Sequence, residues 1–389
     1  MKNKIAYLND SFSNSINGTG IDKFEGYKKY LSTESIQNNK IEKIEEEVTI
    51  DDRPSRANVQ PKYGDVLFAR MQNTEKVMVV DENIENEYIF SSGFMSIKPK
   101  ENILDSNYLS FFFKSKYFNT QKDRLCNGGT QKALNNKSAE KIKFPLPQID
   151  QQKQIAKTLD KAQELIDLRK ESIAKLDELA KSIFIDMFGD PVSNPNNWKE
   201  SELSKVVDKN TIVTYGIVQA GEEFQGGVPY IRTGDIVHGK IKLDGLRYTD
   251  PLIAEKYERS KVLEGEIVMS IRATVGTIAF VPKELDGANL TQGTARISPG
   301  KKVNSKYLFH FIKSEGTQFW ISRQVKGATF KEITLKRLRE MPILLPPIEL
   351  QNKFASIIEK IEEQKSLYEM ELAKLEENFQ ALLQQSFQE

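Results

Sequence analysis

The sequence predicts a mixed α/β protein in which two globular domains alternate with two long helices. The helices are expected to form an antiparallel coiled coil, so that the two halves are related by a pseudo-two-fold. Three observations support this fold class. The chain contains one long internal repeat, two segments have the apolar spacing of coiled-coil helices, and the two larger segments contain short strands followed by helices.

The internal repeat relates the two halves with an offset of 199 residues, as Pro147 corresponds to Pro346. The same offset relates Tyr108 to Tyr307, Gly128 to Gly327, Lys132 to Lys331, Ala156 to Ala355 and Phe188 to Phe387. Solenoid repeats are much shorter, about 20–50 residues. The repeated unit is therefore a whole domain with its connector, which suits a two-part target.

A chain of 389 residues is long enough for two or three domains. The repeat divides it into a first globular domain at 1–144, a helical spacer at 145–190, a second globular domain at 191–344 and a C-terminal helical spacer at 345–389.

The two shorter segments have apolar residues alternately four and three positions apart, which is the seam of a coiled coil. The first seam comprises Ile155, Leu159, Ala162, Ile166, Ile173, Leu176, Ala180, Ile183 and Met187, and the second comprises Phe354, Ile358, Ile361, Tyr368, Leu372, Leu375, Phe379 and Leu382. Arg169 and Lys365 occupy seam positions, where they either fix the register or extend outward along their stems. Gly189 and Pro191 are expected to end the first helix.

Each helix of about 40 residues would be about 60 Å long. A seam of this length needs a partner, and the other copy matches it. Because the first helix must return the chain to a second, equivalent domain, we predict antiparallel pairing, with Ile155 near the region of Phe379 rather than near Phe354.

The larger segments contain the strand patterns of mixed α/β domains. In the second, we expect strands at 228–232, 265–272 and 275–281 and helices at 306–311 and 316–325. The first repeats this order more loosely, with Gly64–Arg70 corresponding to Gly265–Arg272. The N-terminal parts of the two domains differ most, either because they recognise different targets or because they drifted after duplication.

Charge is distributed unevenly although the net charge is only +1. Residues 1–144 have 22 basic and 20 acidic residues, and residues 191–344 have 23 and 17. The spacers at 145–190 and 345–389 have 7 against 9 and 4 against 9. Basic domains with acidic connectors are typical of nucleic-acid binding, and ordinary surface variation is the alternative.

Composition excludes several classes of protein. Apolar runs are shorter than the roughly 18 residues of a membrane span, and Met1–Lys4 does not lead into a signal peptide. The single Cys126 excludes an internal disulfide framework and fits a reducing cytoplasm. One cysteine and the distant His238 and His310 make a zinc site improbable, and we expect no cofactor.

Catalytic motifs are incomplete. Gly234–Lys240 matches a phosphate-binding loop, but Ile241 replaces the required Ser or Thr, and the flanks predict strand-turn-strand. Asn194–Trp198 resembles a methyltransferase motif only faintly and suits a linker better. His238 and His310 have no recognisable catalytic partner. The sequence therefore predicts a protein that is not an enzyme.

An ordered series of motifs resembles the specificity subunit of type I DNA restriction-modification enzymes. The series comprises Gly227–Ile236, Gly265–Gly276, Asn289–Gln292 and Leu344–Gln351. The resemblance covers the whole chain, although the first domain has Gly26–Tyr30 in place of the Gly-Val-Pro motif.

The resemblance implies a non-catalytic subunit with two target-recognition domains. Each domain would read one half of a bipartite, gapped site in double-stranded DNA, and the helices would set the spacing. Two modification (methyltransferase) subunits would dock on the helices, and restriction (translocase/endonuclease) subunits would complete the complex.

Candidate DNA contacts are basic and hydroxyl side chains near predicted turns, because phosphate contacts position a protein and base contacts specify the sequence. In the first domain they are Arg53, Arg56, Lys62, Arg70 and Lys132, and in the second they are Tyr215, Arg232, Arg272, Thr274, Lys326, Thr329 and Lys331. For each of these residues, a solvated or salt-bridged role is the alternative.

Two other functions compete with this interpretation. The first is a coiled-coil scaffold that binds proteins through its two domains and does not bind DNA. Steep salt dependence of duplex binding would separate it from a DNA reader. The second, a self-contained methyltransferase, lacks a glycine-rich cofactor loop.

Overall fold

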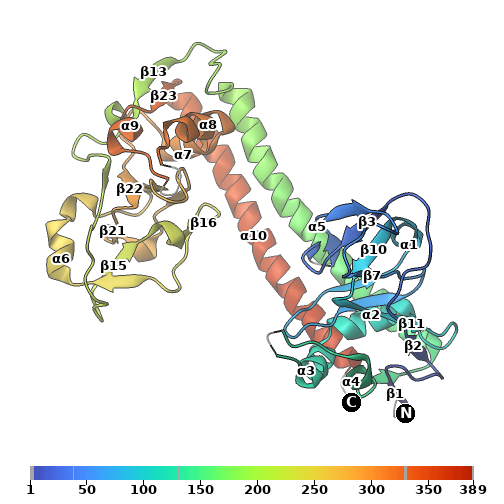
Figure 1. Ribbon diagram of the computed structural model, residues 1–389. Coiled ribbons are helices and arrows are strands. Elements are labelled where there is room, and N and C mark those ends of the chain that lie inside the picture. Colours follow the sequence, from blue (N-terminus) through green and yellow to red (C-terminus); the bar gives the residue numbers. More distant parts are fainter. Residues whose placement is uncertain (1–3, 38, 130, 328–330, 388–389) are drawn as a thin grey trace. The chain divides into compact units, whose positions relative to one another are not determined.

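The computed structural model describes residues 4–37, 39–129, 131–327 and 331–387. The chain forms two compact units. Unit 1 comprises Met1–Lys170 and Met370–Glu389, and unit 2 comprises Glu171–Glu369. Each unit therefore contains one globular part and a portion of each long helix, α5 (Ile149–Phe188) and α10 (Ile348–Phe387) (Figure 1).

Helices α5 and α10 are 40 residues long each, as their glycine-free and proline-free heptads predict. Asp150 and Glu349 lie in the first turns, where a carboxylate complements the helix dipole. Helix α5 ends immediately before Gly189, whose φ of 79° is a left-handed conformation that favours glycine. The division at 144, 190 and 344 stays a prediction, since the compact units include parts of both helices.

A buried glutamine fixes the start of each long helix to its globular part. Gln152 donates from Nε2 to the Pro147 carbonyl at 2.8 Å, and its Oε1 accepts from the amide of Asp105 at 2.9 Å. Gln351 makes the matching bonds to Pro346 and Asn304, both at 2.8 Å. The repeat thus preserves the contacts that orient the helices.

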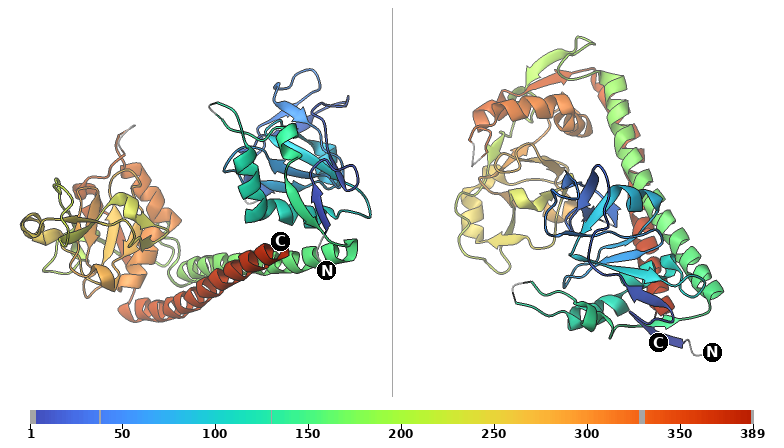
Figure 2. Two further views of the ribbon diagram at one scale, coloured as in Figure 1. Left: turned by 90° about the horizontal axis from the view of Figure 1, so that it is seen from below. Right: turned by 45° about the vertical axis from the view of Figure 1, so that its right-hand side comes forward.

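The globular part of unit 1 combines β-sheets with short helices (Figure 2). Its strands are β1 (Lys4–Tyr7), β2 (Asn14–Ile16), β3 (Lys28–Leu31), β4 (Ile36–Gln37), β5 (Lys40–Ile41), β6 (Glu46–Val48), β7 (Ala57–Val59), β8 (Val66–Ala69), β9 (Val77–Val79), β10 (Tyr88–Ser91), β11 (Phe94–Pro99) and β12 (Lys143–Leu146). Its helices are α1 (Glu82–Glu87), α2 (Ser106–Lys114), α3 (Lys116–Leu125) and α4 (Asn136–Ala139). The main sheets have the orders β6-β3-β10-β7 and β2-β11-β8-β9, and β1 pairs with β12.

Unit 2 repeats this arrangement. Its strands are β13 (Lys199–Glu202), β14 (Thr214–Tyr215), β15 (Val228–Ile231), β16 (Ile236–Val237), β17 (Lys240–Ile241), β18 (Arg247–Thr249), β19 (Ile267–Ser270), β20 (Ile278–Phe280), β21 (Asn289–Leu290), β22 (Thr294–Ile297) and β23 (Pro342–Leu345). Its helices are α6 (Pro251–Lys256), α7 (Ser305–Lys313), α8 (Glu315–Gln324) and α9 (Leu335–Arg339), with short 3₁₀ turns η1 (Leu203–Lys205), η2 (Thr233–Asp235), η3 (Glu258–Ser260) and η4 (Lys283–Leu285). The order β14-β22-β19-β20 matches β2-β11-β8-β9, and β18-β15-β21 matches the first three strands of β6-β3-β10-β7, with no described counterpart of β7 in that sheet.

The structure confirms the strands and helices expected at 228–232, 265–272, 275–281, 306–311 and 316–325. It also confirms the strand-turn-strand reading of Gly234–Lys240, because β16 and β17 form an antiparallel hairpin. His238 and Gly239, at its tip, have φ of 49° and 79°. A hairpin of this kind lacks the helix N-terminus that a phosphate-binding loop needs.

Within each unit, the long helices pack in the core of the globular part. In unit 1, Ala156, Leu159 and Ile166 of α5 share a buried cluster with Phe379, Leu383 and Phe387 of α10. In unit 2, Ala180, Phe184 and Phe188 of α5 cluster with Phe354 and Ile358 of α10. The start of α5 thus contacts the end of α10 in unit 1, and the end of α5 contacts the start of α10 in unit 2.

Both cationic seam residues are ion-paired within their own units. Arg169 Nη2 lies 2.8 Å from Glu371 Oε2 in unit 1, and Lys365 Nζ lies 2.6 Å from Asp177 Oδ1 in unit 2. Their side chains are about one-quarter exposed, so the stems lie along the seam while the charges reach carboxylates on the other helix.

Candidate nucleic-acid interface

Two loops of unit 1 are joined by backbone hydrogen bonds and bring Arg70 and Lys132 together. One loop connects β8 to β9, and the other connects α3 to α4. The amide of Leu134 donates to the Arg70 carbonyl at 2.8 Å, and the amide of Gln72 donates to the Lys132 carbonyl at 3.0 Å. Asn127 and Ala133 bond to each other, which closes the second loop into a hairpin.

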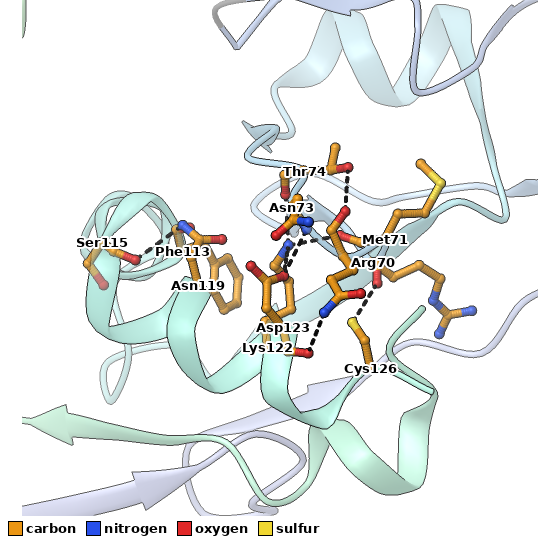
Figure 3. A network of polar contacts seen from close by, with 11 residues as sticks. Arg70, Met71, Asn73, Thr74, Phe113, Ser115, Asn119, Lys122, Asp123 and Cys126 are labelled. Atoms are coloured by element: carbon orange, nitrogen blue, oxygen red, sulfur yellow. Dashed lines mark hydrogen bonds and ion pairs between the residues drawn. The ribbon is translucent and has the colours of Figure 1, made fainter. Parts of the chain in front are cut away.

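A buried lysine holds the β8–β9 loop against α3 (Figure 3). Lys122 is fully buried, and its Nζ donates to the carbonyls of Met71 at 2.9 Å and Thr74 at 2.8 Å. The neighbouring Asp123 lies 3.1 Å from the same ammonium and accepts from the amide of Asn73 at 3.0 Å. A paired and fully hydrogen-bonded ammonium is the form in which a buried charge is tolerated.

Arg70 is held at the edge of this network. Its Nη2 donates to Asn136 Oδ1 at 2.8 Å, and burial lowers the pKa of its guanidinium. The buried Nε has no hydrogen-bond partner among the described residues. The Arg70 carbonyl also accepts from Cys126 Sγ at 3.6 Å, and burial raises the pKa of that thiol. Unsatisfied buried donors are uncommon in folded proteins.

Unit 2 has the corresponding pair of loops, between β19 and β20 and between α8 and α9. The amide of Ala273 donates to the Lys331 carbonyl at 3.0 Å, and Lys326 and Glu332 bond to each other. Arg272 Nε donates to Glu332 Oε2 at 3.0 Å, with both side chains more than two-fifths exposed. The loops are therefore fixed here by an exposed ion pair.

Several predicted contacts of unit 2 gather at these loops. Tyr215 and Arg272 line one cavity of about 180 Å³, together with Gln292 and Glu332. The Thr274 hydroxyl lies 3.2 Å from that of Ser270. Lys326 and Lys331 belong to the bonded loop, and Thr329 lies outside the described residues.

Arg53, Arg56, Lys62 and Arg232 lie outside the loop pairs. Arg53 donates to the Ala57 carbonyl at 2.9 Å, and Lys62 lies 3.2 Å from Asp22. Arg56 lines a different cavity, of about 530 Å³, with three glutamates. Arg232 donates to both carboxylate oxygens of Asp235, at 3.0 and 2.7 Å, and this carboxylate raises the pKa of Arg232. These four residues stay predicted DNA contacts, with partners that compete for them.

The sequence analysis missed Lys122, Asp123 and Glu332. Lys122 had one available signal, since it lies four residues after the buried Phe118 on a helix. Asp123 and Glu332 had none, because each acts on a loop more than 45 residues away in sequence.

The described residues contain no group of three His, Cys, Asp or Glu side chains placed to hold a metal ion. Burial lowers the pKa of His310 to about 4, with Lys313 and Lys306 contributing, so that its half-buried imidazole is neutral. In the same part of the chain, no helix is long and apolar enough to cross a membrane.

Comparison with known proteins identifies the family. The family described as "Type I restriction modification DNA specificity domain" matches residues 12–178 and 195–377, which is most of the chain. The chain belongs to this family. This match confirms the resemblance seen in the sequence. Each of the two matched ranges contains one pair of joined loops.

The chain is similar to the type I restriction enzyme EcoBI specificity subunit of Escherichia coli, to which it is 26% identical over 258 residues. That match covers 60% of this chain and 54% of the relative, so the chain aligns with about half of its length. The MjaVIII specificity subunit of Methanocaldococcus jannaschii is 25% identical over 356 residues, covering 88% of this chain and 80% of the relative.

Solved structures of the specificity family share the fold. One chain in a solved structure of a type I R-M system superposes on this chain with a TM-score of 0.61 and is 20% identical to it in sequence. The match covers 93% of this chain and 91% of the other. The S subunit of the M. genitalium system has a TM-score of 0.54 at 15% identity, with both chains covered in full. The mixed α/β architecture with two specificity domains is therefore confirmed.

Proposed function

We propose that this chain is the non-catalytic DNA-specificity subunit of a type I restriction-modification complex. Each globular part, at 1–144 and 191–344, reads one half of a bipartite, gapped duplex site. The observation that carries the proposal is the pair of joined basic loops that recurs at the same place in both repeats, with Arg70 and Lys132 in one and Arg272 and Lys331 in the other.

The long helices form an antiparallel coiled coil that sets the distance between the two readers. Three observations support this. The predicted seam positions of α5 and α10 are buried or half-buried, the helices meet in opposite directions within each unit, and Lys365 pairs with Asp177 across the seam. Each of the two 40-residue helices is about 60 Å long.

The outer faces of α5 and α10, at 145–190 and 345–389, dock two modification subunits, which supply the methyl transfer. Restriction subunits add translocation and cleavage. The family membership supports this division of labour, as does the placement of Lys122 and Arg70, which serve loop geometry rather than a reaction centre.

The test is the methylation pattern of DNA in cells that contain this chain and its modification subunit. We expect one motif with two specific halves and an unread gap. Exchanging residues 1–144 for the corresponding part of another family member should change one half of the motif only. A continuous motif, or a change in both halves, would refute the proposal.

Duplex binding distinguishes the DNA reader from the coiled-coil scaffold. Phosphate contacts release counterions, so the logarithm of the binding constant should fall steeply with the logarithm of salt concentration, by about 0.9 per neutralised phosphate. Duplex binding that is absent, or that is insensitive to salt, would favour a protein-binding scaffold.

A further inference from the structure

A groove of about 690 Å³ lies in unit 1, between α3 and the last turns of α10. Its rim carries Lys116 and Arg124 of α3 with Lys141 and Lys143 from the segment that leads into β12. Leu383 and Phe387 of α10 line its base. The groove, hereafter the basic groove, thus combines four cationic side chains with an apolar floor.

In the described part of the chain, the cations of the basic groove have no carboxylate partner. Other lysines of unit 1, such as Lys29 and Lys170, are ion-paired. Lys143 lies over the ring of Tyr7 at 5.8 Å. Like charges around one cavity repel one another, and a bound anionic group would relieve that repulsion.

The basic groove and the candidate DNA loop lie on opposite faces of α3. Successive residues of a helix are about 100° apart, so Lys116, Thr120 and Arg124 share one face while Lys122 points the other way. Lys122 contacts the β8–β9 loop, whereas Lys116, Thr120 and Arg124 line the groove. DNA bound at the loops would therefore leave the groove accessible.

The corresponding place in unit 2 has different side chains. At the offset of 199, Glu315, Gly316, Glu340 and Pro342 replace Lys116, Tyr117, Lys141 and Lys143. The charge on the rim is thus reversed at two positions, while the aromatic floor residue is kept, with Phe188 in place of Phe387.

In unit 2 the chain's own linker contacts this place. A Cβ added to Gly316 would lie 2.8 Å from Cγ2 of Val192, so the linker leaves no room for a side chain there. The Trp198 indole donates to the Phe188 carbonyl at 2.9 Å and packs against the core. The linker that continues from α5 is therefore an irregular segment that lies against α8 at Gly316.

We propose that the basic groove of unit 1 docks an extended, acidic segment of a partner polypeptide. In unit 2 an irregular segment lies against the corresponding helix, but Tyr117 of unit 1 stands at the position of Gly316, where that segment makes its contact. The docked segment would therefore lie over the apolar floor of Leu383 and Phe387. Four cations that have no carboxylate partner among the described residues select acidic residues beside that floor, namely Lys116, Arg124, Lys141 and Lys143. This surface is separate from the loops proposed to bind DNA.

The test uses the full chain and two fluorescein-labelled peptides. One has the sequence of residues 190–198, and the other has glutamate in place of its three asparagines, at 194, 196 and 197. Fluorescence anisotropy is measured at an ionic strength of about 0.1 M, where the screening length is about 10 Å. We expect the acidic, glutamate-substituted peptide to bind at least about tenfold more tightly than the peptide of natural sequence, whose one acidic side chain is Asp190.

The matched variant combines Lys116→Glu with Lys141→Glu, which introduces the residues that unit 2 has at these positions. It should lose at least about tenfold in affinity for the acidic peptide and keep its affinity for a labelled duplex of random sequence. Its circular dichroism and melting temperature establish that the variant is folded.

Three results would overturn the proposal. The first is equal binding of the acidic peptide by the wild type and the double variant. The second is loss of duplex binding in the variant together with competition between peptide and duplex, which would assign the groove to DNA phosphates. The third is peptide binding only after deletion of residues 1–3 and 388–389, which would assign the groove to the chain's own ends. Failure of duplex binding alone would refute the proposed function and leave the docking surface standing.

Discussion

Replacing Lys122 with methionine should loosen the loop that carries Arg70 and weaken recognition of one half-site. Methionine keeps the length and most of the volume of the buried stem, so packing around Phe118 changes little. The substitution removes the donor shared by the carbonyls of Met71 and Thr74, and it leaves Asp123 without its cation.

The magnitude follows from these three groups. The carbonyls of Met71 and Thr74 belong to half-buried residues, so each one left without a donor costs about 1 kcal/mol, at the low end of the range of about 1–3 kcal/mol for buried acceptors. The carboxylate of Asp123 is partly exposed and can be hydrated, so its loss is at the low end of that range. We therefore expect a local destabilisation of about 3 kcal/mol, or roughly a hundredfold faster amide exchange at residues 71–76.

Hydrogen exchange measured by mass spectrometry on the full chain reports this change by segment. Lys137→Met, at an exposed lysine of the neighbouring α4, is the control and should leave the exchange of this loop unchanged. The methylation motif should lose discrimination in one half only. Unchanged protection of residues 71–76 in the Lys122 variant would refute the assignment of Lys122 as the anchor of the loop.

Three further predictions concern unit 2 and the helix starts. Arg272→Ala should weaken specific DNA binding by about 1–3 kcal/mol and relax one half-site, and an unchanged motif with unchanged affinity would remove Arg272 from the interface. Burial, Lys313 and Lys306 lower the pKa of His310 from 6.5 to about 4, against the opposing effect of Asp177. His310 therefore contributes stability that is complete above pH 6.5 and is lost as the pH falls towards 4. The loss of unfolding free energy between pH 6.5 and pH 4 should be at most about 3 kcal/mol, measured by melting at a series of pH values. His310→Phe, which introduces the residue found at the equivalent Phe111, should reduce the pH dependence of stability in that range. Gln152→Ala and Gln351→Ala should each lower stability by about 2 kcal/mol, seen as a drop in melting temperature, because each leaves a buried carbonyl and amide unpaired; a shift in only one variant would contradict the equivalence of the two helix starts.

Local sequence patterns were sufficient to predict the long helices. Heptad spacing without glycine or proline over about 40 residues has few other solutions, and Gly189 followed by Pro191 defines the end of α5. The hairpin at His238 was similarly predictable, because the Gly234–Lys240 segment has strand patterns on both sides. In each of these cases the information lies within a few turns of the chain.

The candidate interface was less predictable because its geometry depends on contacts between distant segments. The sequence identified Arg70 and Arg272 as basic residues at turns, but their partners Asn136 and Glu332 are 66 and 60 residues away. A lysine such as Lys122 is ordinarily placed on a helix surface, and only the arrangement of the β8–β9 loop makes its burial favourable. Charge and turn chemistry predict candidates, and packing selects among them.

The two repeats keep the same framework and differ in how their loops and grooves are built. Tyr108 and Tyr307 donate to matching carbonyls of Pro145 and Leu344, so the cores retain the same helix positions.

The loops above these cores are fixed by different means. In unit 1, a network around the buried Lys122 holds the loop. In unit 2, Ile321 is the residue that corresponds to Lys122 in the repeat, and an exposed Arg272–Glu332 ion pair joins the loops. An exposed pair contributes little stability and is easily replaced, whereas a buried network is costly to alter. Unit 2 should therefore stay folded when residues around Arg272 are substituted. In unit 1, a change of specificity must preserve Lys122 or replace the whole of its loop.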